Sequence, residues 1–296
     1  MVIKSLGPGS LNFIPKRKIE ANKGTYGHVL IIAGSLGMAG AAYLSALSAY
    51  RSGAGLVRIL TVGENRSVLQ TALPEAIITA YSLRSALESP RAFTNLINSC
   101  LSWASVIVLG PGLSTEPHAK ILVEQVLQEA YVPVIVDADA LNIIAQNPFL
   151  TGFYTENIII TPHMGEMARL TGKTIEEIVR DPQAAACAYQ EAHGITCVLK
   201  SHKTVIATKD DILYLNQSGS PAMAKAGSGD VLCGIIAGMF CLGLEDSLAV
   251  ALGVYIHGLA GERAAAKIGE HSIIARDIIG AIGFVMQEGG KNSDIL

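Results

Sequence analysis

The sequence of 296 residues is poor in the residue types that several classes of protein require. Only 16% of its residues are charged and the net charge is −3, so the large basic surface typical of nucleic-acid-binding proteins is absent. The five cysteines are scattered and form no CxxC pair, which argues against a disulfide framework and against a zinc site. We expect them to be buried, reduced thiols of a cytoplasmic protein.

Long hydrophobic runs are absent as well. The longest apolar stretch, residues 231–244, is bounded by Asp230 and Glu245 and falls short of the roughly twenty residues that a membrane span needs. The first residues also lack the apolar run of a signal peptide. We therefore expect a soluble chain, located in the cytoplasm and bound neither to a membrane nor to nucleic acid.

What is present is a regular alternation of short apolar runs rich in β-branched residues with longer stretches of helical period. This order predicts an α/β fold with a mostly parallel central sheet and helices on both of its faces. We expect a hairpin turn around residues 209–211. Strands are predicted at residues 28–33, 56–60, 106–109, 134–136, 158–160, 197–199, 205–207 and 213–215, and helices at residues 39–51, 117–130, 164–170, 175–191, 231–242 and 247–266.

No stretch of the chain has the composition of an interdomain linker. We expect an N-terminal extension at residues 1–22, one catalytic domain at residues 23–288 and a disordered tail at residues 289–296. In open α/β sheets ligands bind beyond the carboxyl ends of the strands, so the loops after the predicted strands are where functional residues are expected.

The strongest functional signal is the sequence AKAGSGD at residues 224–230, which leads directly into an apolar helix. Gly227 and Gly229 allow a tight turn that presents backbone N–H groups at a helix N-terminus, where phosphate is favoured. Asp230 follows in the first turn. The alternative is that Asp230 only caps the helix, but that leaves the small, glycine-rich run before it unexplained. The run is neither a Walker A motif nor a GxGxxG fingerprint.

Other loops after predicted strands offer further candidates, each with a structural alternative. Asp137 and Asp139 end a strand two residues apart, so they could share a Mg²⁺ ion, or Asp139 could cap the following helix while Asp137 bonds to the backbone. His163 and Glu166 lie on one face at the start of a helix, where a histidine is often structural. The basic residues after the strand at 197–199 either contact a ligand or form a solvated turn.

Several motifs together resemble a known family. The GSGD sequence resembles the anion-hole and catalytic-aspartate motif of the ribokinase-like superfamily. Together with KGTYGH at residues 23–28, DADALN at 137–142 and TPHMGE at 161–166, it resembles the ADP- or ATP-dependent NAD(P)H-hydrate dehydratases. The resemblance runs over residues 23–285 and implies a ribokinase-like fold. It leaves no room for the N-terminal epimerase domain that some relatives carry.

The resemblance also implies a reaction. The 6-hydroxyl of the S epimer of hydrated NADH or NADPH is phosphorylated by ADP or ATP, and loss of phosphate restores the reduced nicotinamide. Asp230 removes the hydroxyl proton, and the loop of Gly227, Ser228 and Gly229 neutralises the phosphoryl group. The substrate is expected against Ala41, Gly112, His163 and Asp230, and the nucleotide against Lys200, Ser201, His202, Lys203, Thr204 and Gly229.

The metal, the nucleotide and the assembly are expectations of the same kind. Glu166 is the residue expected to organise Mg²⁺, directly or through water. The family has glycine where this chain has Ser201, which puts the backbone of that loop in question if a positive φ is needed. By analogy we expect ADP as the phosphoryl donor and a homotetramer.

Two other functions stay open at this point. A small-molecule kinase for a vitamin-precursor alcohol, of thiazole or pyrimidine type, would share the GSGD motif. A nucleotide sensor that keeps the fold without catalysis is the other, although the intact Asp230 argues against it.

Overall fold

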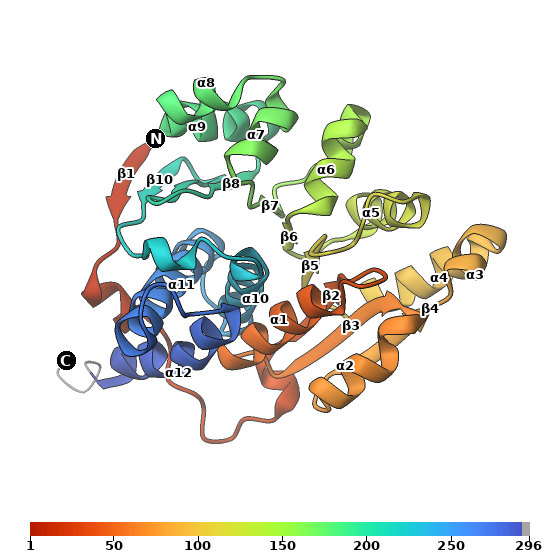
Figure 1. Ribbon diagram of the computed structural model, residues 1–296, viewed down its shortest axis with the longest axis horizontal. Coiled ribbons are helices and arrows are strands. Elements are labelled where there is room, and N and C mark those ends of the chain that lie inside the picture. The colour runs from red at the N-terminus through yellow and green to blue at the C-terminus, as the bar shows by residue number, and fades with distance from the viewer. Residues whose placement is uncertain (292–296) are drawn as a thin grey trace.

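The computed structural model describes residues 1–291, and one sheet of ten strands runs through this part of the chain (Figure 1). The strand order is β1-β10-β9-β8-β7-β6-β5-β2-β3-β4. Strands β2 to β8 are parallel, β9 is antiparallel to both of its neighbours, and β1 pairs in parallel with β10. The strands are β1 Val2–Ser5, β2 His28–Ile32, β3 Leu56–Val62, β4 Ile77–Tyr81, β5 Val106–Leu109, β6 Val134–Val136, β7 Ile158–Ile160, β8 Thr196–Leu199, β9 Val205–Ala207 and β10 Ile212–Leu215.

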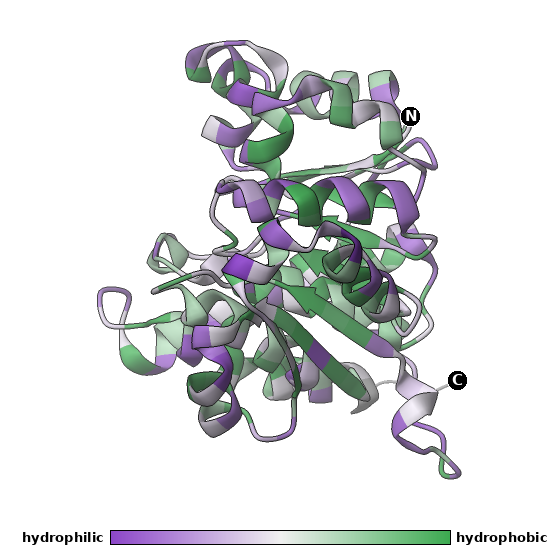
Figure 2. Ribbon diagram, turned by 90° about the vertical axis from the view of Figure 1, so that its right-hand side faces the viewer, coloured by the Kyte–Doolittle hydropathy of each residue, from purple (hydrophilic) through white to green (hydrophobic). Residues whose placement is uncertain are grey.

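Helices cover both faces of this sheet, as the alternating pattern predicts. Val29 and Ile31 of β2 belong to one hydrophobic core, and Leu30 and Ile32 to the other. Figure 2 shows the strands hydrophobic along most of their length, between helices that carry hydrophilic outer turns. The helices are α1 Ala39–Arg51, α2 Arg66–Ala72, α3 Leu83–Glu88, α4 Pro90–Leu101, α5 Pro117–Glu129, α6 Asp139–Gln146, α7 Met164–Thr171, α8 Ile175–Arg180, α9 Pro182–His193, α10 Ser228–Cys241, α11 Asp246–Ile268 and α12 Ala275–Lys291.

Helix α10 packs unusually closely on α1, and this contact fixes the position of its N-terminus. A Cβ atom added at Gly234 would lie 2.0 Å from Ser48 Oγ and 2.1 Å from Ser45 O. Gly238 meets Ser52 in the same way, at 2.1 Å from its Oγ. The glycines in the apolar helix are therefore explained by close backbone approach.

Three predictions need correction. The helix predicted at residues 175–191 is two helices, because Asp181 caps a new helix that begins at Pro182. Residues 1–22, predicted as an extension, supply the edge strand β1. The tail predicted at residues 289–296 begins inside α12, which continues to Lys291, and residues 292–296 lie outside the described residues.

The hairpin predicted around residues 209–211 is confirmed, since β9 and β10 are antiparallel neighbours. Asp211 has a φ of 58° in this turn, a value that aspartate tolerates better than most residues. No helix within residues 1–291 is both long enough and apolar enough to cross a membrane.

Candidate active site

The candidate site lies at the carboxyl edge of the sheet, where five neighbouring parallel strands end. Strands β2, β5, β6, β7 and β8 all point their carboxyl ends toward this edge. The loops that follow two of these strands are joined directly, because His163 and Lys200 form an isolated parallel bridge. Helix α10 begins at the same edge, since Gly229 lies beside Asp137 and Lys200. This is the place at which α/β folds bind ligands.

The loop before α10, residues 224–227, turns sharply at Gly227, which has a φ of 88°. A Cβ atom there would lie 2.6 Å from Leu44 Cδ1 and 2.9 Å from Ala275 Cβ, so only glycine fits. Ser228 begins the helix, and its Oγ lies 3.3 Å from His257 Nε2. We call residues 226–229 the anion loop, because their N–H groups lie at the N-terminus of a 14-residue helix.

Asp230 is the third residue of α10, and Gly227 occupies the N-cap. The interpretation in which Asp230 is the N-cap is therefore wrong. Within the described residues its carboxylate makes no hydrogen bond and no ion pair. Burial and the nearby Asp137 together raise the pKa of Asp230 to about 6, although Lys200 opposes the shift. Asp230 is half-buried, and a half-buried carboxylate with a pKa near neutrality and no partner is typical of a catalytic base.

A buried ion pair stands beside the anion loop. Lys200 Nζ lies 2.6 Å from Asp137 Oδ1 and 3.9 Å from Glu166 Oε2. Cys233 Sγ donates to the other Asp137 oxygen at 3.3 Å. A Cβ atom at Gly229 would lie 3.5 Å from Lys200 Nζ, so the ammonium group borders the anion loop.

The charge of Lys200 is maintained by its neighbours. Burial alone would lower the pKa of Lys200, but Asp137 and Glu166 outweigh it and raise the pKa above its ordinary value. The Lys200 side chain is 21% exposed, so the solvated basic turn considered from the sequence is wrong for this residue. The site therefore has a fixed positive charge where an anion would lie.

His163 and Glu166 cap α7 together. His163 Nδ1 accepts hydrogen bonds from the N–H groups of Gly165 and Glu166, and Glu166 Oε2 accepts one from His163 N–H at 2.8 Å. The ring proton of His163 therefore lies on Nε2, 3.4 Å from Glu166 Oε1. Burial, with Lys200 and Arg169, lowers the pKa of His163. The structural role is thus real, yet the ring is 54% exposed and free to contact a ligand.

The two residues predicted to contact the substrate from the other side lie together. A Cβ atom at Gly112 would lie 2.9 Å from Ala41 Cβ and 3.0 Å from Met38 Cβ. Gly112 has a φ of 58°, and Gly34 N–H donates to Pro111 O to hold the two loops side by side. The loops after β2 and β5 therefore form one wall of the site.

The loop predicted to bind the nucleotide connects β8 with β9. His202 and Lys203 are exposed, and Thr204 is buried. Ser201 does not have a positive φ. The serine at this position, where the family has glycine, therefore causes no backbone strain. Its Oγ donates to Lys203 O and accepts from Lys203 N–H, which closes the turn.

Asp137 and Asp139 do not act as a pair. The strand β6 ends at Val136, and Ala138 has a φ of 51°, so the two side chains diverge. Asp137 binds Lys200, whereas Asp139 accepts a hydrogen bond from Ser114 N–H at 2.8 Å. These separate partners argue against a magnesium ion shared by the two carboxylates. No group of three or more histidine, cysteine, aspartate or glutamate residues forms a ready metal site within residues 1–291.

Sequence reasoning missed three contributors to the site. The pairing of Asp137 with Lys200 was not foreseen, nor was the thiol of Cys233 as a donor to that carboxylate. The third is His257, whose Nε2 lies 3.3 Å from Ser228 Oγ; burial lowers the pKa of His257 to about 4, so the ring is neutral near pH 7. The prediction of free thiols is confirmed for all five cysteines, four of them buried.

The sheet and the anion loop with its aspartate define a ribokinase-like protein. A solved structure of a ribokinase-like superfamily protein from Enterococcus faecalis superposes with a TM-score of 0.82, at 30% identity over 97% of this chain and 96% of that one. A family model described as NAD(P)H-hydrate dehydratase matches residues 29–282. The chain belongs to the NAD(P)H-hydrate dehydratase family.

Curated relatives agree with this assignment. The ADP-dependent (S)-NAD(P)H-hydrate dehydratase of Bacillus subtilis is 35% identical over 90% of this chain and 91% of its own length. A solved structure of the ADP/ATP-dependent NAD(P)H-hydrate dehydratase from that organism, co-crystallised with ATP and Mg²⁺, has a TM-score of 0.81 at 31% identity and covers 95% of this chain and 96% of its own.

A bifunctional NAD(P)H-hydrate repair enzyme from Moorella thermoacetica is 39% identical over 93% of this chain. The chain spans only 52% of that relative, and so about half the length of the bifunctional proteins that it matches.

Proposed function

We propose that this chain dehydrates the S epimer of hydrated NADH and NADPH at the expense of a nucleotide phosphate, and so repairs damaged nicotinamide nucleotides. The observation that carries the proposal is the unpartnered Asp230 carboxylate in the first turn of α10, behind the anion loop and beside the Lys200 ammonium group. Family membership favours this function over the vitamin-precursor kinase.

In the first step the substrate hydroxyl attacks the terminal phosphorus of the nucleotide. Asp230 takes the hydroxyl proton, a role worth about 10²–10⁴ in rate, and its pKa of about 6 leaves it unprotonated at neutral pH. The N–H groups of Ala226, Gly227 and Gly229 donate to the phosphoryl oxygens, whereas Ser228 N–H donates to Lys225 O. Each such donor contributes about 3 kcal/mol of transition-state stabilisation.

Lys200 supplies the charge that complements this loop. Its ammonium group borders Gly229 and is held there by Asp137, so it offers a positive charge that needs no rearrangement when the phosphoryl group arrives. The Cys233 thiol donates a hydrogen bond to the second oxygen of Asp137, so both oxygens of that carboxylate already have partners. We therefore assign Asp137 and Cys233 a positioning role and Asp230 the proton transfer.

The second step restores the ring. The bond between C6 and the phosphate oxygen breaks, phosphate leaves with the electron pair, and the neighbouring carbon loses a proton to form the double bond. The balance is hydrated NADH plus ADP giving NADH, AMP, phosphate and a proton. The neutral His163 ring, exposed on the substrate side, supports a contact with the nicotinamide.

Magnesium fits this donor set with the phosphates as its main ligands. Glu166 is 5% exposed, and among the described residues its Oε1 faces only His163 Nε2, so one carboxylate oxygen is available directly or through water. Mg²⁺ commonly takes one or two protein carboxylates together with substrate phosphates. When bound, it would neutralise phosphate charge during transfer. Glu166 is the residue that we expect to hold it.

The nucleotide is placed against residues 200–204 and Gly229, with ADP as the preferred donor. Lys203 and His202 are exposed there and can reach a ribose or phosphate, and relatives of this length are named ADP-dependent. We also propose a cytoplasmic location, consistent with free thiols throughout. A homotetramer rests on the family resemblance and can be checked by light scattering.

The function is tested by incubating the chain with hydrated NADH, Mg²⁺ and either ADP or ATP. The expected result is recovery of reduced-nicotinamide absorbance with one AMP and one phosphate released per NADH when ADP is used. A stable phosphorylated product without recovered NADH would instead indicate a kinase. Absence of nucleotide consumption would contradict the proposal outright.

A further inference from the structure

Two cavities adjoin the candidate site, and they differ in charge. One, of about 360 Å³, lies between the first turns of α1 and α12 and reaches the anion loop at Ala226. The other, of about 240 Å³, lies between the loops after β2 and β5. The larger one has Arg276 in its wall, whereas the smaller one has Glu116 and no lysine or arginine. A phosphate-bearing ligand would therefore be attracted to the larger cavity and repelled by the smaller.

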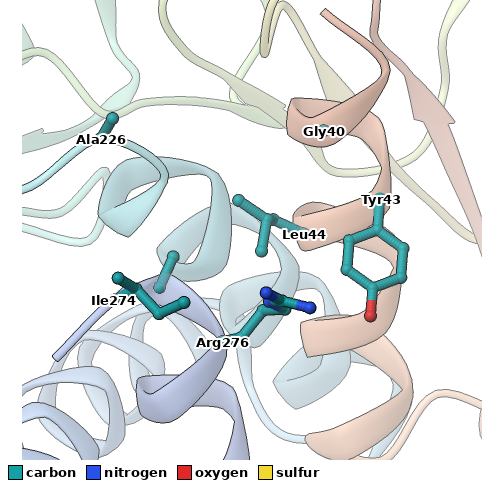
Figure 3. A pocket seen from close by; sticks show the side chains of 7 residues that line it. Gly40, Tyr43, Leu44, Ala226, Ile274 and Arg276 are labelled. Atoms are coloured by element: carbon teal, nitrogen blue, oxygen red, sulfur yellow. The ribbon is translucent and has the colours of Figure 1, made fainter.

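The larger cavity borders the anion loop. Its wall residues Leu44 and Ala275 are the side chains that enclose Gly227 of the anion loop. Gly40, at its rim, immediately precedes Ala41, where the substrate is expected. Figure 3 shows Ala226 on one side of the cavity and Gly40 and Tyr43 on the other. A ligand whose reacting end lies at Asp230 can thus extend into this space.

The guanidinium group of Arg276 is available to bind a ligand. It is the second residue of α12, near the positive end of the helix dipole, which disfavours a cation at that position. Within the described residues its guanidinium makes no hydrogen bond and no ion pair, and the adjacent Asp277 is engaged with Ile274 N–H. A phosphate there would interact favourably with both the guanidinium group and the helix N-terminus.

The remaining walls suit the other parts of a nucleotide. Leu44, Ile274 and Ala275 are apolar, and the Tyr43 ring lies at the same side as Arg276 (Figure 3). Ligand pockets typically combine such an apolar lining with a few fixed polar groups, in volumes of about 300–1,000 Å³.

We propose that this cavity binds the part of the dinucleotide substrate beyond the reacting nicotinamide, with Arg276 donating hydrogen bonds to one of its phosphates. The proposal rests on the proposed function for the identity of the ligand. It separates the two nucleotides in space, with the phosphoryl donor on the β8–β9 loop and the substrate between α1 and α12.

The test compares Arg276→Ala with Arg91→Ala. Arg91 is also an exposed arginine at the second position of a helix, α4, so it controls for charge and helix dipole. A charged hydrogen bond is worth about 1.5–3 kcal/mol, or about 10–100-fold in affinity. Arg276→Ala should raise KM for hydrated substrate by about that factor, with kcat and KM for ADP changed less than about twofold, and Arg276→Lys should lose less.

The outcomes distinguish the two sources of phosphate. Equal losses with hydrated NADH and hydrated NADPH assign Arg276 to the pyrophosphate, whereas a loss confined to hydrated NADPH assigns it to the 2′-phosphate. An unchanged KM for both, with wild-type turnover intact, overturns the inference and leaves the function standing.

If the wild-type chain shows no turnover, the function fails, and binding of unhydrated NADPH, followed by its fluorescence, decides the inference separately. Weaker binding by Arg276→Ala than by Arg91→Ala would support it. Equal binding by both, or none to the wild type, would overturn it.

Discussion

At the scale of single residues, Asp230 is a carboxylate whose charge is opposed by its surroundings. Burial and the nearby Asp137 both raise its pKa, and Lys200 compensates only in part. A base must be unprotonated to accept the hydroxyl proton, and it accepts that proton more readily when its pKa lies near the working pH. The same features by which a charged Asp230 destabilises the folded chain thus make it an effective base.

The first expectation concerns pH. Because the pKa of Asp230 is about 6, kcat/KM for hydrated NADH should be level near neutrality and fall about tenfold per pH unit below that value. Initial rates across the range, with the nucleotide saturating, measure this acid limb. A profile that stays flat well below pH 6 would show that another group accepts the proton.

Substitution of Asp137 provides a second test of the same electrostatics. Asp137→Asn removes a negative charge that raises the pKa of Asp230 and releases the positive charge of Lys200 that lowers it. Both effects act in one direction, so the acid limb should move to lower pH. Turnover at neutral pH should also fall, because Lys200 loses its anchor. A reduced rate with an unmoved limb would indicate a purely structural role for Asp137.

The third expectation is that Asp230→Asn stabilises the fold. The folded-state pKa of about 6 exceeds the ordinary value of 3.8, so wild-type stability is lost as pH rises from about 4 to 6. The loss is about 3 kcal/mol above pH 6. Urea unfolding should therefore show the variant more stable at pH 7 and similar to wild type near pH 4. A variant less stable than wild type at pH 7 would contradict the assigned burial cost.

Some of the residue-scale site could be predicted from sequence and some could not. Asp230 was identified because a small, glycine-rich run leads into an apolar helix, a local pattern. The pairing of Asp137 with Lys200 joins residues 63 positions apart. Their strands, β6 and β8, are separated by β7 in the sheet. The order of residues along the chain does not show that these two lie side by side. The pair and its thiol donor Cys233 could therefore not be predicted from the sequence.

At the scale of elements, the contact between α1 and α10 sets the position of the anion loop. Strand bounds such as Val106–Leu109 and Ile158–Ile160 were predictable, because fully buried parallel strands read as short apolar runs. The break between α8 and α9 was missed although the sequence signals it, because Pro182 disfavours the interior of a helix and Asp181 before it is a typical N-cap.

The fourth expectation uses two helical glycines with opposite surroundings. A Cβ atom at Gly234 would lie within 2.1 Å of Ser45 and Ser48 of α1, whereas one at Gly280 in α12 meets nothing within 4 Å. Gly234→Ala should therefore force the helices apart and destabilise the chain by several kcal/mol. Gly280→Ala should stabilise it by about 0.5–1 kcal/mol. Thermal unfolding of both variants measures this, and equal effects would contradict the close packing.

At the scale of the whole molecule, the order of the strands brings distant loops to one edge. The fold class was predictable because alternation of apolar strands and helices admits few topologies. The cavity beside Arg276 was not, because it unites α1, the anion loop and α12, which come together only when the helices pack on the sheet.

Turnover by Asp230→Asn, assayed beside the wild type with hydrated NADH and ADP, tests the proposed function most directly. We expect a loss of at least about a hundredfold in kcat. Binding of ADP and of NADPH should be retained, since the amide replaces the carboxylate without closing the site. A variant that keeps more than about a tenth of wild-type turnover would contradict the assignment of the proton transfer to this residue.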